Sequence, residues 1–359
     1  MTIDGRNIIS FCSNDYLGLA NHPKLKQAAI DGIRKYGVGS GAAHLINGHS
    51  RAHHQLEEEL AEFTGYPRTL LFTTGYMANL GLCQALLDNK DYVFEDRLNH
   101  ASLIDAALLS GARFQRYLHN DTQSLHCKLN RIKDPKADKL VMTDAVFSMD
   151  GDIADLPGLV SVCRESDSTL MVDDAHGFGV LGENGRGSRH HFGLQTGDIP
   201  VYMATLGKAM GSAGAFIAGS EELIETLIQQ ARSYIYTTAM PPAIAEAGRT
   251  AISLLQDEPQ HLQKLRENIA CFRQYCLQLN LPVENSETAI QPLLIGNDKN
   301  AVIISEQLFA SGFLVTAIRP PTVPEGTARL RITLSTAHTP GQIEQLAALL
   351  ASTYRQFAV

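Results

Sequence analysis

A regular alternation of short apolar runs and longer amphipathic segments constrains the fold of this chain most strongly. Six apolar runs have the length of strands: 68–74, 91–96, 139–148, 169–177, 201–207 and 213–219. Segments with helical periodicity lie between or beside them, at 53–65, 75–87, 101–111, 156–166 and 221–234. Because parallel strands need long crossover connections, which are usually helices, we predict an α/β domain with a mostly parallel sheet covered on both faces.

The pattern changes after residue 242. Helical patterns follow at 243–257, 259–279 and 340–357, and short apolar runs stand at 289–296, 313–318 and 328–335. This order is typical of a smaller α+β domain, and 359 residues exceed what one hydrophobic core usually supports. We therefore predict an N-terminal segment over 1–45, a large domain over 46–250 and a small C-terminal domain over 251–359.

The composition excludes several classes of protein. The formal net charge is -8 without any basic block, which argues against nucleic-acid binding. No run approaches 18 apolar residues, so we expect no membrane span, and the N-terminus lacks the pattern of a secretory signal. The six cysteines include no CxxC pair, which is typical of reduced thiols in a cytoplasmic protein.

Small and polar residues follow the predicted strands. Because the carboxyl ends of parallel strands meet at the edge of the sheet where α/β proteins bind ligands, we expect these residues to converge. They are Gly75 and Tyr76 after the first run, His100 after the second, Ser148 at the end of the third, Asp173 and His176 in the fourth, and Thr205 and Lys208 around the end of the fifth. We interpret this set as a candidate ligand site.

The residue types in this set fit pyridoxal 5'-phosphate (PLP). A carboxylate at the end of an apolar strand, Asp173, requires a cationic or donating partner such as a protonated ring nitrogen. Lys208 lies among small residues, where burial favours a nucleophilic amine. The helix start at "TTGYMANLG" offers backbone N–H groups to a phosphate, and His100 offers a flat ring to the face of the cofactor.

The segment "GFGVLG" at 177–182 matches the glycine fingerprint of dinucleotide-binding folds. That fingerprint must open a helix, whereas residues 177–190 stay rich in glycine and polar side chains. We therefore predict a loop here and no nicotinamide cofactor.

His49 and His53 stand four residues apart, which is the spacing of one helical turn and can hold a metal. No acidic or cysteine partner follows at ligand spacing. We therefore predict no metal site and interpret this segment as an ordinary helix.

Several longer motifs resemble those of a known family. They are "SNDYLGLA", "GVGSG", "VFSMDGDIADL", "VDDAHGFGVLGENGRG", "TLGKAMG", "IYTTAMPP" and "AIRPPTVPEGTARLRITLSTAH". They span essentially the whole chain, which resembles the α-oxoamine synthases, PLP enzymes of the aspartate-aminotransferase-like fold (fold type I). The resemblance implies a large domain with a seven-stranded, mostly parallel sheet between helices, and a smaller α+β C-terminal domain.

Within that family, segments 289–296 and 317–338 are most similar to the member that acts in biotin biosynthesis. The resemblance implies a condensation of L-alanine with a pimeloyl thioester of coenzyme A or acyl-carrier protein, with release of CO2 and the free thiol. It also implies a homodimer with shared active sites. A sister synthase that uses another amino acid or acyl-CoA, such as glycine C-acetyltransferase, and a non-catalytic homologue remain as alternatives.

The resemblance also implies residue roles. Lys208 would bind the cofactor covalently and remove the Cα proton, Asp173 would meet the pyridine nitrogen, and His176 would meet the ring hydroxyl. His100 would stack on the ring, and Lys208, His100 and Asp173 form the implied catalytic set. The remaining implied cofactor ligands are Gly75, Tyr76, Ser148 and Thr205.

Substrate positions follow in the same way. The resemblance implies that Asn14 and Thr322 contact the substrate, with Arg319 and Arg331 as candidates to hold a carboxylate. It further implies that Thr237 and Thr238 reach the phosphate bound by the partner subunit.

The sequence departs from the family pattern at two places. Family members normally carry a helical extension with a substrate-contacting arginine ahead of "NDYLGL", whereas Met1 stands just upstream of "FCSNDY". We therefore expect a short N-terminal segment. Asp144 stands where relatives tend to carry glutamate, and its shorter side chain reaches less far.

Overall fold

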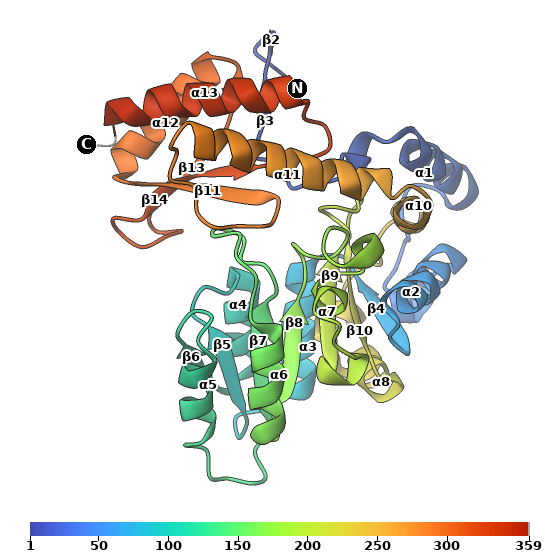
Figure 1. Cartoon of the computed structure of the whole chain (residues 1–359). Helices are drawn as coiled ribbons and strands as arrows, with labels where there is room; N and C mark the ends of the chain where they lie inside the picture. Colours follow the sequence, from blue (N-terminus) through green and yellow to red (C-terminus); the bar gives the residue numbers. More distant parts are fainter. Residues whose placement is uncertain (358–359) are drawn as a thin grey trace. The chain divides into compact units, whose positions relative to one another are not determined.

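The structure is a computed structural model that describes residues 1–357. The chain divides into two compact units (Figure 1). The large unit comprises residues 19–147 and 154–258, and the small unit comprises 1–18, 148–153 and the chain from 259 on. These boundaries differ from the predicted ones at 45/46 and 250/251. The large unit begins at residue 19 and ends at 258, and residues 148–153 belong to the small unit.

Local packing explains the difference. Helix α1 (Pro23–Tyr36) packs along α10 (Pro242–Asp257). The two helices approach closely at Gly32, where a Cβ atom would lie 2.7 Å from the backbone of α10. Both helices therefore belong to the large unit. In the small unit, β3 (Ile9–Ser10) pairs in parallel with β12 (Phe313–Leu314), so the first residues of the chain belong with its C-terminal part.

A seven-stranded sheet forms the centre of the large unit, in the order β4-β10-β9-β8-β7-β5-β6 (Figure 1). The strands are β4 Arg68–Phe72, β5 Tyr92–Asp96, β6 Arg113–Tyr117, β7 Lys139–Asp144, β8 Thr169–Asp173, β9 Val201–Thr205 and β10 Ala215–Gly219. Only β10 runs antiparallel to its neighbours. The predicted α/β class with a mostly parallel sheet is confirmed, and all six predicted runs contain strands.

Helices cover both faces of this sheet (Figure 1). Besides α1 and α10, the α-helices of the large unit are α2 Arg51–Thr64, α3 Gly75–Leu86, α4 Ala101–Ser110, α5 Thr122–Leu129, α6 Leu156–Glu165, α7 Ser188–His191, α8 Glu221–Gln230 and α9 Arg232–Ile235. Its short helical segments are η1 Leu19–Asn21, η2 His44–Gly48, η3 Glu183–Gly185 and η4 Thr196–Asp198. On one face, Leu82 of α3 and Leu103 of α4 pack in one buried cluster with Met142 and Met203 of the strands. Burial on both faces explains why these strands read as continuous apolar runs.

Strand β6 is absent from the sequence-based prediction. Its sequence, Arg113–Tyr117, contains two arginines and has no continuous apolar run. It lies at the edge of the sheet, where one side has no neighbouring strand and polar side chains reach water. Helix α5 was also missed, because it is short and mostly polar.

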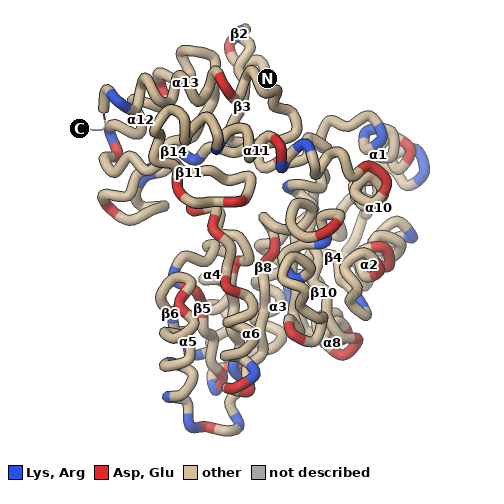
Figure 2. The backbone as a smooth tube through the Cα atoms, in the orientation of Figure 1, with Lys and Arg blue, Asp and Glu red and all other residues tan. Residues whose placement is uncertain are grey.

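Charges of both signs are interspersed along the large and the small unit (Figure 2). This distribution agrees with the absence of a basic block in the sequence. Within residues 1–357, no helix is both long and apolar enough to cross a membrane.

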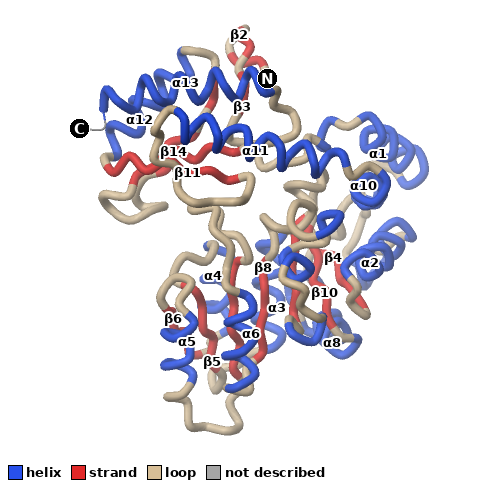
Figure 3. The backbone as a smooth tube through the Cα atoms, viewed as in Figure 1, coloured by secondary structure: helices blue, strands red, loops and turns tan. Residues whose placement is uncertain are grey.

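The small unit is an α+β structure (Figure 3). Its three-stranded antiparallel sheet has the order β11-β14-β13, and its two-stranded pairs are β1-β2 and β12-β3. The bounds are β1 Thr2–Ile3, β2 Arg6–Asn7, β11 Ile290–Gly296, β13 Thr316–Ile318, β14 Ala328–Thr333, α11 Gln260–Gln278, α12 Asp298–Ala310 and α13 Pro340–Phe357. The predicted α+β character of the C-terminal part is thus present.

Candidate active site

Four neighbouring strands of the large unit end at the same edge of the sheet. They are β9, β8, β7 and β5, and their last residues are Thr205, Asp173, Asp144 and Asp96. The loops that follow these strands therefore start side by side. This edge is where parallel α/β sheets bind ligands.

Lys208 lies in the loop after β9, and its amine faces a histidine from the loop after β8. The distance between Lys208 Nζ and His176 Nε2 is 2.8 Å. His176 is buried and Lys208 is half-buried. An amine held in this way beside an imidazole can exchange a proton with it, so the pair can support acid–base chemistry.

The position of Lys208 depends on Gly211. The N–H of Gly211 donates to the Lys208 carbonyl at 2.9 Å, which closes a tight turn. Gly211 has a φ of 62°, and a Cβ atom there would lie 2.4 Å from the nitrogen of Ala20. A larger residue would be strained by its backbone angle and would also collide with η1. The small residues around the lysine are therefore required by the geometry of the loop.

A chain of hydrogen bonds connects Asp173 to His100. The buried Asn79 side chain donates Nδ2 to Asp173 Oδ2 and to Ser102 Oγ, both at 2.9 Å. Ser102 Oγ lies 2.8 Å from His100 Nδ1. The other Asp173 oxygen accepts the backbone N–H of Ala175 at 3.0 Å. These contacts fix the orientation of both the carboxylate and the imidazole.

His100 caps the N-terminus of α4, where its Nδ1 accepts the backbone N–H of Ser102 at 3.2 Å. Burial lowers the pKa of His100, Asp173 opposes this shift, and Lys208 lowers the pKa further. The ring is therefore neutral at physiological pH. A neutral, oriented imidazole suits contact with an aromatic ligand face.

Asp144 lies directly beside Asp173, in register on the adjacent strand. Its Oδ2 accepts the backbone N–H of His100 at 2.7 Å. Burial, and then the neighbouring charge of Asp173, raise the pKa of Asp144 well above its usual range. This raised pKa favours the protonated form of Asp144, which limits the negative charge at this edge of the sheet.

Asp174, next to Asp173, has a structural role. Its Oδ2 accepts the Tyr202 hydroxyl at 2.6 Å and the Ser188 backbone N–H at 2.7 Å, and burial raises its pKa to about 7. These bonds anchor the glycine-rich segment from 177 to 187, which consists of turns, bends and the short 3-10 helix η3. The "GFGVLG" segment itself lies in turns and bends and opens no α-helix, as predicted for a loop.

The predicted phosphate-binding residues lie at the start of α3 and the end of β9. Thr74 caps α3 by accepting the Met77 N–H at 3.1 Å, and the helix begins at Gly75. Tyr76 is exposed, and its hydroxyl donates to Asp105. The Thr205 hydroxyl donates to the Gly214 carbonyl at 2.9 Å and accepts the Gly207 N–H at 3.1 Å.

The family of the chain follows from a comparison with known proteins. The family model for aminotransferases of class I and II matches residues 6–350, which is nearly the whole chain. The chain belongs to the aminotransferase class I and II family.

Relatives within this family are close. A curated 8-amino-7-oxononanoate synthase from Thioalkalivibrio sulfidiphilus is 60% identical over 344 residues, covering 96% of this chain and 88% of the relative. The solved 8-amino-7-oxononanoate synthase from Francisella tularensis is 34% identical, with a TM-score of 0.85, covering 98% of this chain and 99% of that one. A serine palmitoyltransferase from S. paucimobilis with a bound PLP–myriocin aldimine is 29% identical, with a TM-score of 0.95, covering 99% and 90%. The predicted resemblance and the predicted fold type I are thus confirmed.

The small unit of this aminotransferase-family chain gathers three of the predicted residues. Arg331 is buried on β14, and its Nε donates to the Ser148 carbonyl at 2.6 Å. Its Nη2 donates to Asn14 Oδ1 at 3.1 Å. For Ser148 the structure thus places the carbonyl, and not the hydroxyl, against the guanidinium. Burial raises the pKa of the adjacent Tyr16 to about 12, with Arg331 opposing the shift.

Arg319 and Thr322 lie apart from that group. Both are exposed, and they share the turn after β13, where the Thr322 N–H donates to the Arg319 carbonyl at 3.0 Å. Of the two candidate arginines, only Arg331 is buried and held by several acceptors. Thr237 and Thr238 lie in the large unit, where the Thr238 carbonyl accepts the Thr73 hydroxyl at 3.4 Å.

Sequence reasoning missed Asn79 and Ser102. Asn79 stands on the apolar face of "GYMANLGLCQAL", and a fully buried amide there must have partners. The position of Asn79 among apolar residues was visible in the sequence, but the hydrogen-bond partners of its amide were not. Asp173 and Ser102 come from different elements, and only the packing of α3 and α4 on β8 brings them to Asn79.

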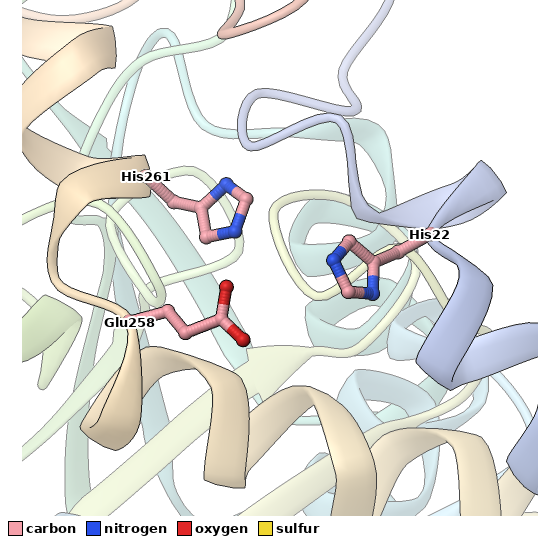
Figure 4. Close-up of side chains that lie close together, drawn as sticks. All are labelled: His22, Glu258 and His261. Carbon is pink, nitrogen blue, oxygen red and sulfur yellow. The ribbon is translucent and has the colours of Figure 1, made fainter.

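Figure 4 draws the side chains of His22, Glu258 and His261. His22 and Glu258 belong to the large unit, and His261 belongs to the small unit. Within the large unit, Lys24 Nζ donates to Glu258 Oε1 at 2.6 Å, and the Lys24 N–H donates to His22 Nδ1 at 3.3 Å. Glu258 is thus already neutralised by a cation, and we assign no ligand to this group.

Proposed function

We propose that this chain catalyses the PLP-dependent condensation of L-alanine with a pimeloyl thioester, which yields 8-amino-7-oxononanoate, CO2 and the free thiol carrier in biotin biosynthesis. The observation that carries the proposal is 60% identity over 96% of the chain to a curated 8-amino-7-oxononanoate synthase. The amine, imidazole and carboxylate at one sheet edge support it independently.

The residues at this edge fit PLP. Asp173 is only 3% exposed, so its carboxylate suits a cationic ring nitrogen better than bulk water. The N-terminus of α3 suits a phosphate dianion. When bound, PLP supplies an electron sink for the charge that develops at Cα of the amino acid.

We assign the cofactor contacts accordingly. Lys208 would bind the cofactor covalently, Asp173 would hold the ring nitrogen in its protonated form, and His176 would meet the ring hydroxyl. The His100 ring would cover one face of the cofactor. Gly75, Tyr76, Ser148 and Thr205 complete the set of proposed ligands.

Proton transfer is the task of Lys208. Lys208 Nζ would remove the Cα proton of L-alanine and later return a proton to the product. His176 Nε2, at 2.8 Å, orients the amine through this cycle. The raised pKa of Asp144 disfavours a second negative charge beside Asp173, which would face the ring nitrogen.

For the substrate, we propose contacts from Asn14, Arg319, Thr322 and Arg331. Arg331 is the better candidate for a carboxylate, because its guanidinium is already oriented by Ser148 and Asn14 and a planar fork binds carboxylates in two places. The exposed Arg319 is free of that orientation and suits a more distant group of the acyl chain.

We further propose a homodimer in the cytoplasm, in which Thr237 and Thr238 reach the phosphate bound by the partner subunit. Half-buried and exposed threonines at the end of "IYTT" support this assignment. All six cysteines are free thiols in the structure, in keeping with a reducing compartment.

A sister synthase is the second candidate, because the serine palmitoyltransferase has the higher TM-score, 0.95 against 0.85. Backbone similarity reports the fold shared by the family, whereas specificity depends on pocket side chains, where a methyl group or two changes binding by about 1–3 kcal/mol. The 60% identity therefore favours L-alanine and the pimeloyl group.

The test is product formation with matched substrates. We expect 8-amino-7-oxononanoate, detected by mass spectrometry, from L-alanine with pimeloyl-CoA or pimeloyl-acyl-carrier protein. Lys208→Ala should form no product and lose the visible absorbance change on addition of L-alanine, while the exposed-lysine control Lys26→Ala keeps both. Turnover of glycine with acetyl-CoA but not of L-alanine would identify a sister synthase. Protein that never acquires visible absorbance with PLP would identify a non-catalytic homologue.

A further inference from the structure

A second group of titratable side chains lies at the start of α2, and none of its members is assigned to the reaction. One ligand atom from each of His49, His54 and Glu57 lies within 4.8 Å of the others. His49 precedes the helix, whereas His54 and Glu57 are three residues apart in it and share one face. The distance between His49 Nε2 and Glu57 Oε2 is 3.8 Å, which is too long for a hydrogen bond.

The other atoms of these side chains are already engaged. His49 Nδ1 lies 2.9 Å from His44 Nδ1, and the His44 ring stacks on Tyr234 with centroids 4.7 Å apart. When His49 Nδ1 carries the shared proton, Nε2 keeps its lone pair on the side of Glu57. Glu57 Oε1 accepts the Leu71 N–H at 3.0 Å, which leaves Oε2 facing His49. Metal-binding histidines are typically oriented through their second nitrogen in this way.

His53 is not part of this group, although its spacing from His49 suggested it. Its Nε2 lies 2.6 Å from the Met240 carbonyl, and its Nδ1 accepts the Ser50 N–H at 3.0 Å. Both ring nitrogens are thus occupied inside the protein. The expectation that no acidic partner stands at ligand spacing is also wrong, because Glu57 approaches His49 from the second turn of α2.

We propose that His49 Nε2, His54 Nε2 and Glu57 Oε2 form a binding site for a divalent transition metal ion, with Zn²⁺ as the best match. Two imidazoles and a carboxylate are a usual ligand set for zinc, with a fourth position for water. Bonds of about 2.0–2.1 Å in a tetrahedron place the ligand atoms roughly 3.4 Å apart. Small side-chain rotations bring the three atoms from their present separation to that value.

The cost of this rearrangement is small. His54 Nε2 now lies 3.3 Å from Glu58 Oε1, and both side chains are well exposed. An exposed pair of this kind contributes little to stability, so a metal bond replaces it readily. Glu58 also remains near enough to accept a hydrogen bond from metal-bound water.

The Glu57 carboxylate is largely shielded from water, with its side chain 14% exposed. The guanidinium of Arg68 is already paired with Glu221 and Glu225. A divalent ion would supply a positive charge beside the Glu57 carboxylate.

A bound ion would tie the segment before α2 to the second turn of that helix. The site makes no use of PLP or of the substrates, so it is independent of the proposed function. Its expected role is structural, and binding should raise the thermal midpoint of the holoenzyme.

The test is zinc titration of the PLP-loaded protein against a chromophoric chelator. We expect the wild-type protein to bind one equivalent of zinc per chain. This binding should be lost, or its affinity weakened at least 10-fold, in both His54→Gln and Glu57→Gln. His54 is exposed, so its variant should fold normally. His126→Gln is the matched control, because His126 also faces a carboxylate, Glu165, at 3.6 Å, but it belongs to no group of three ligands within residues 1–357. It should bind zinc like the wild type.

Crystals of the holoenzyme soaked in zinc provide the second measurement. An anomalous peak within bonding distance of His49, His54 and Glu57 supports the site. Unchanged stoichiometry and affinity in both variants, or an anomalous signal only at other residues, would overturn the proposal.

Discussion

Glu95 offers the sharpest test of the electrostatics beneath the candidate site. It lies on β5, is 0% exposed, and neither of its carboxyl oxygens has a hydrogen-bond partner within residues 1–357. Burial raises its pKa from 4.5 to about 8, against smaller lowering effects of Asn99 and Arg116. Its charge also contributes to the raised pKa of Asp144. At neutral pH, Glu95 is therefore mainly protonated.

This shift makes stability depend on pH with a defined sign. The folded protein holds the Glu95 proton more tightly than the unfolded chain does. A rise in pH therefore favours the unfolded chain, in which Glu95 ionises first. The contribution of Glu95 is complete below about pH 4.5 and is lost as the pH rises towards about 8. At about 1.4 kcal/mol for each pKa unit, the loss between about pH 5 and pH 8 is on the order of 3–4 kcal/mol.

Glu95→Gln removes this titration, because the amide is neutral at every pH. Burying its additional N–H adds a cost of about 1–3 kcal/mol that does not depend on pH. We therefore expect the free energy of unfolding of the variant, relative to wild type, to improve by about 3–4 kcal/mol from about pH 5 to pH 8. Urea unfolding at several pH values, with PLP held constant, measures the difference. The exposed control Glu62→Gln should follow the wild-type curve.

Parallel curves for Glu95→Gln and wild type, within about 1 kcal/mol over this range, would refute the reasoning. They would mean that Glu95 is ionised in the folded protein and that a positive or hydrogen-bonding group stabilises its charge. The pH slope is the decisive quantity, since a single-pH comparison mixes the titration with the burial of the amide.

Two further predictions concern the supports of the site. Gly211→Ala should destabilise the protein by about 1–3 kcal/mol in urea unfolding and lower kcat, because its Cβ atom would collide with Ala20. The control Gly193→Ala has a similar φ but open space around it, so it should keep kcat. Equal losses of kcat in the two variants would contradict this reasoning. Asn79→Ala removes the side-chain donor to Asp173 and should weaken PLP binding on the order of 10-fold, as measured by absorbance titration. Ser102→Ala should have a smaller effect. Unchanged PLP affinity in Asn79→Ala would argue that the Asp173 carboxylate does not need the Asn79 hydrogen bond.

The central sheet was predictable because its signal is local and strong. Strands buried on both faces read as apolar runs, and the helices between them fix the parallel arrangement. The edge strand β6 gave no such signal, because water on one side relaxes the demand for apolar side chains. The unit boundaries were also hidden, since the pairing of β3 with β12 joins residues that are far apart in the sequence.

The candidate site was predictable only in part. Asp173 and Lys208 could be identified because each stands at a strand end where a charge is costly or unusual. The contact between Lys208 and His176 depends on how two loops fold over the same edge, and the spacing in the sequence does not contain that information. The raised pKa of Asp144 likewise follows from its burial and from its register beside Asp173, which a sequence without pairing information cannot give.

The histidines before α2 show why a spacing rule needs the helix boundary. His49 and His53 are four residues apart, and one helical turn would bring them together if both were helical. His49 instead lies outside the helix, which begins at Arg51, so the rule does not apply to it. His54 and Glu57 lie inside the helix, where a spacing of three places them on one face. The extended residues before Arg51 then return His49 to that face, and the His44 ring fixes its orientation. The ligand set is therefore set by where α2 starts, and moving that start by one residue would pair His49 with a different face of the helix.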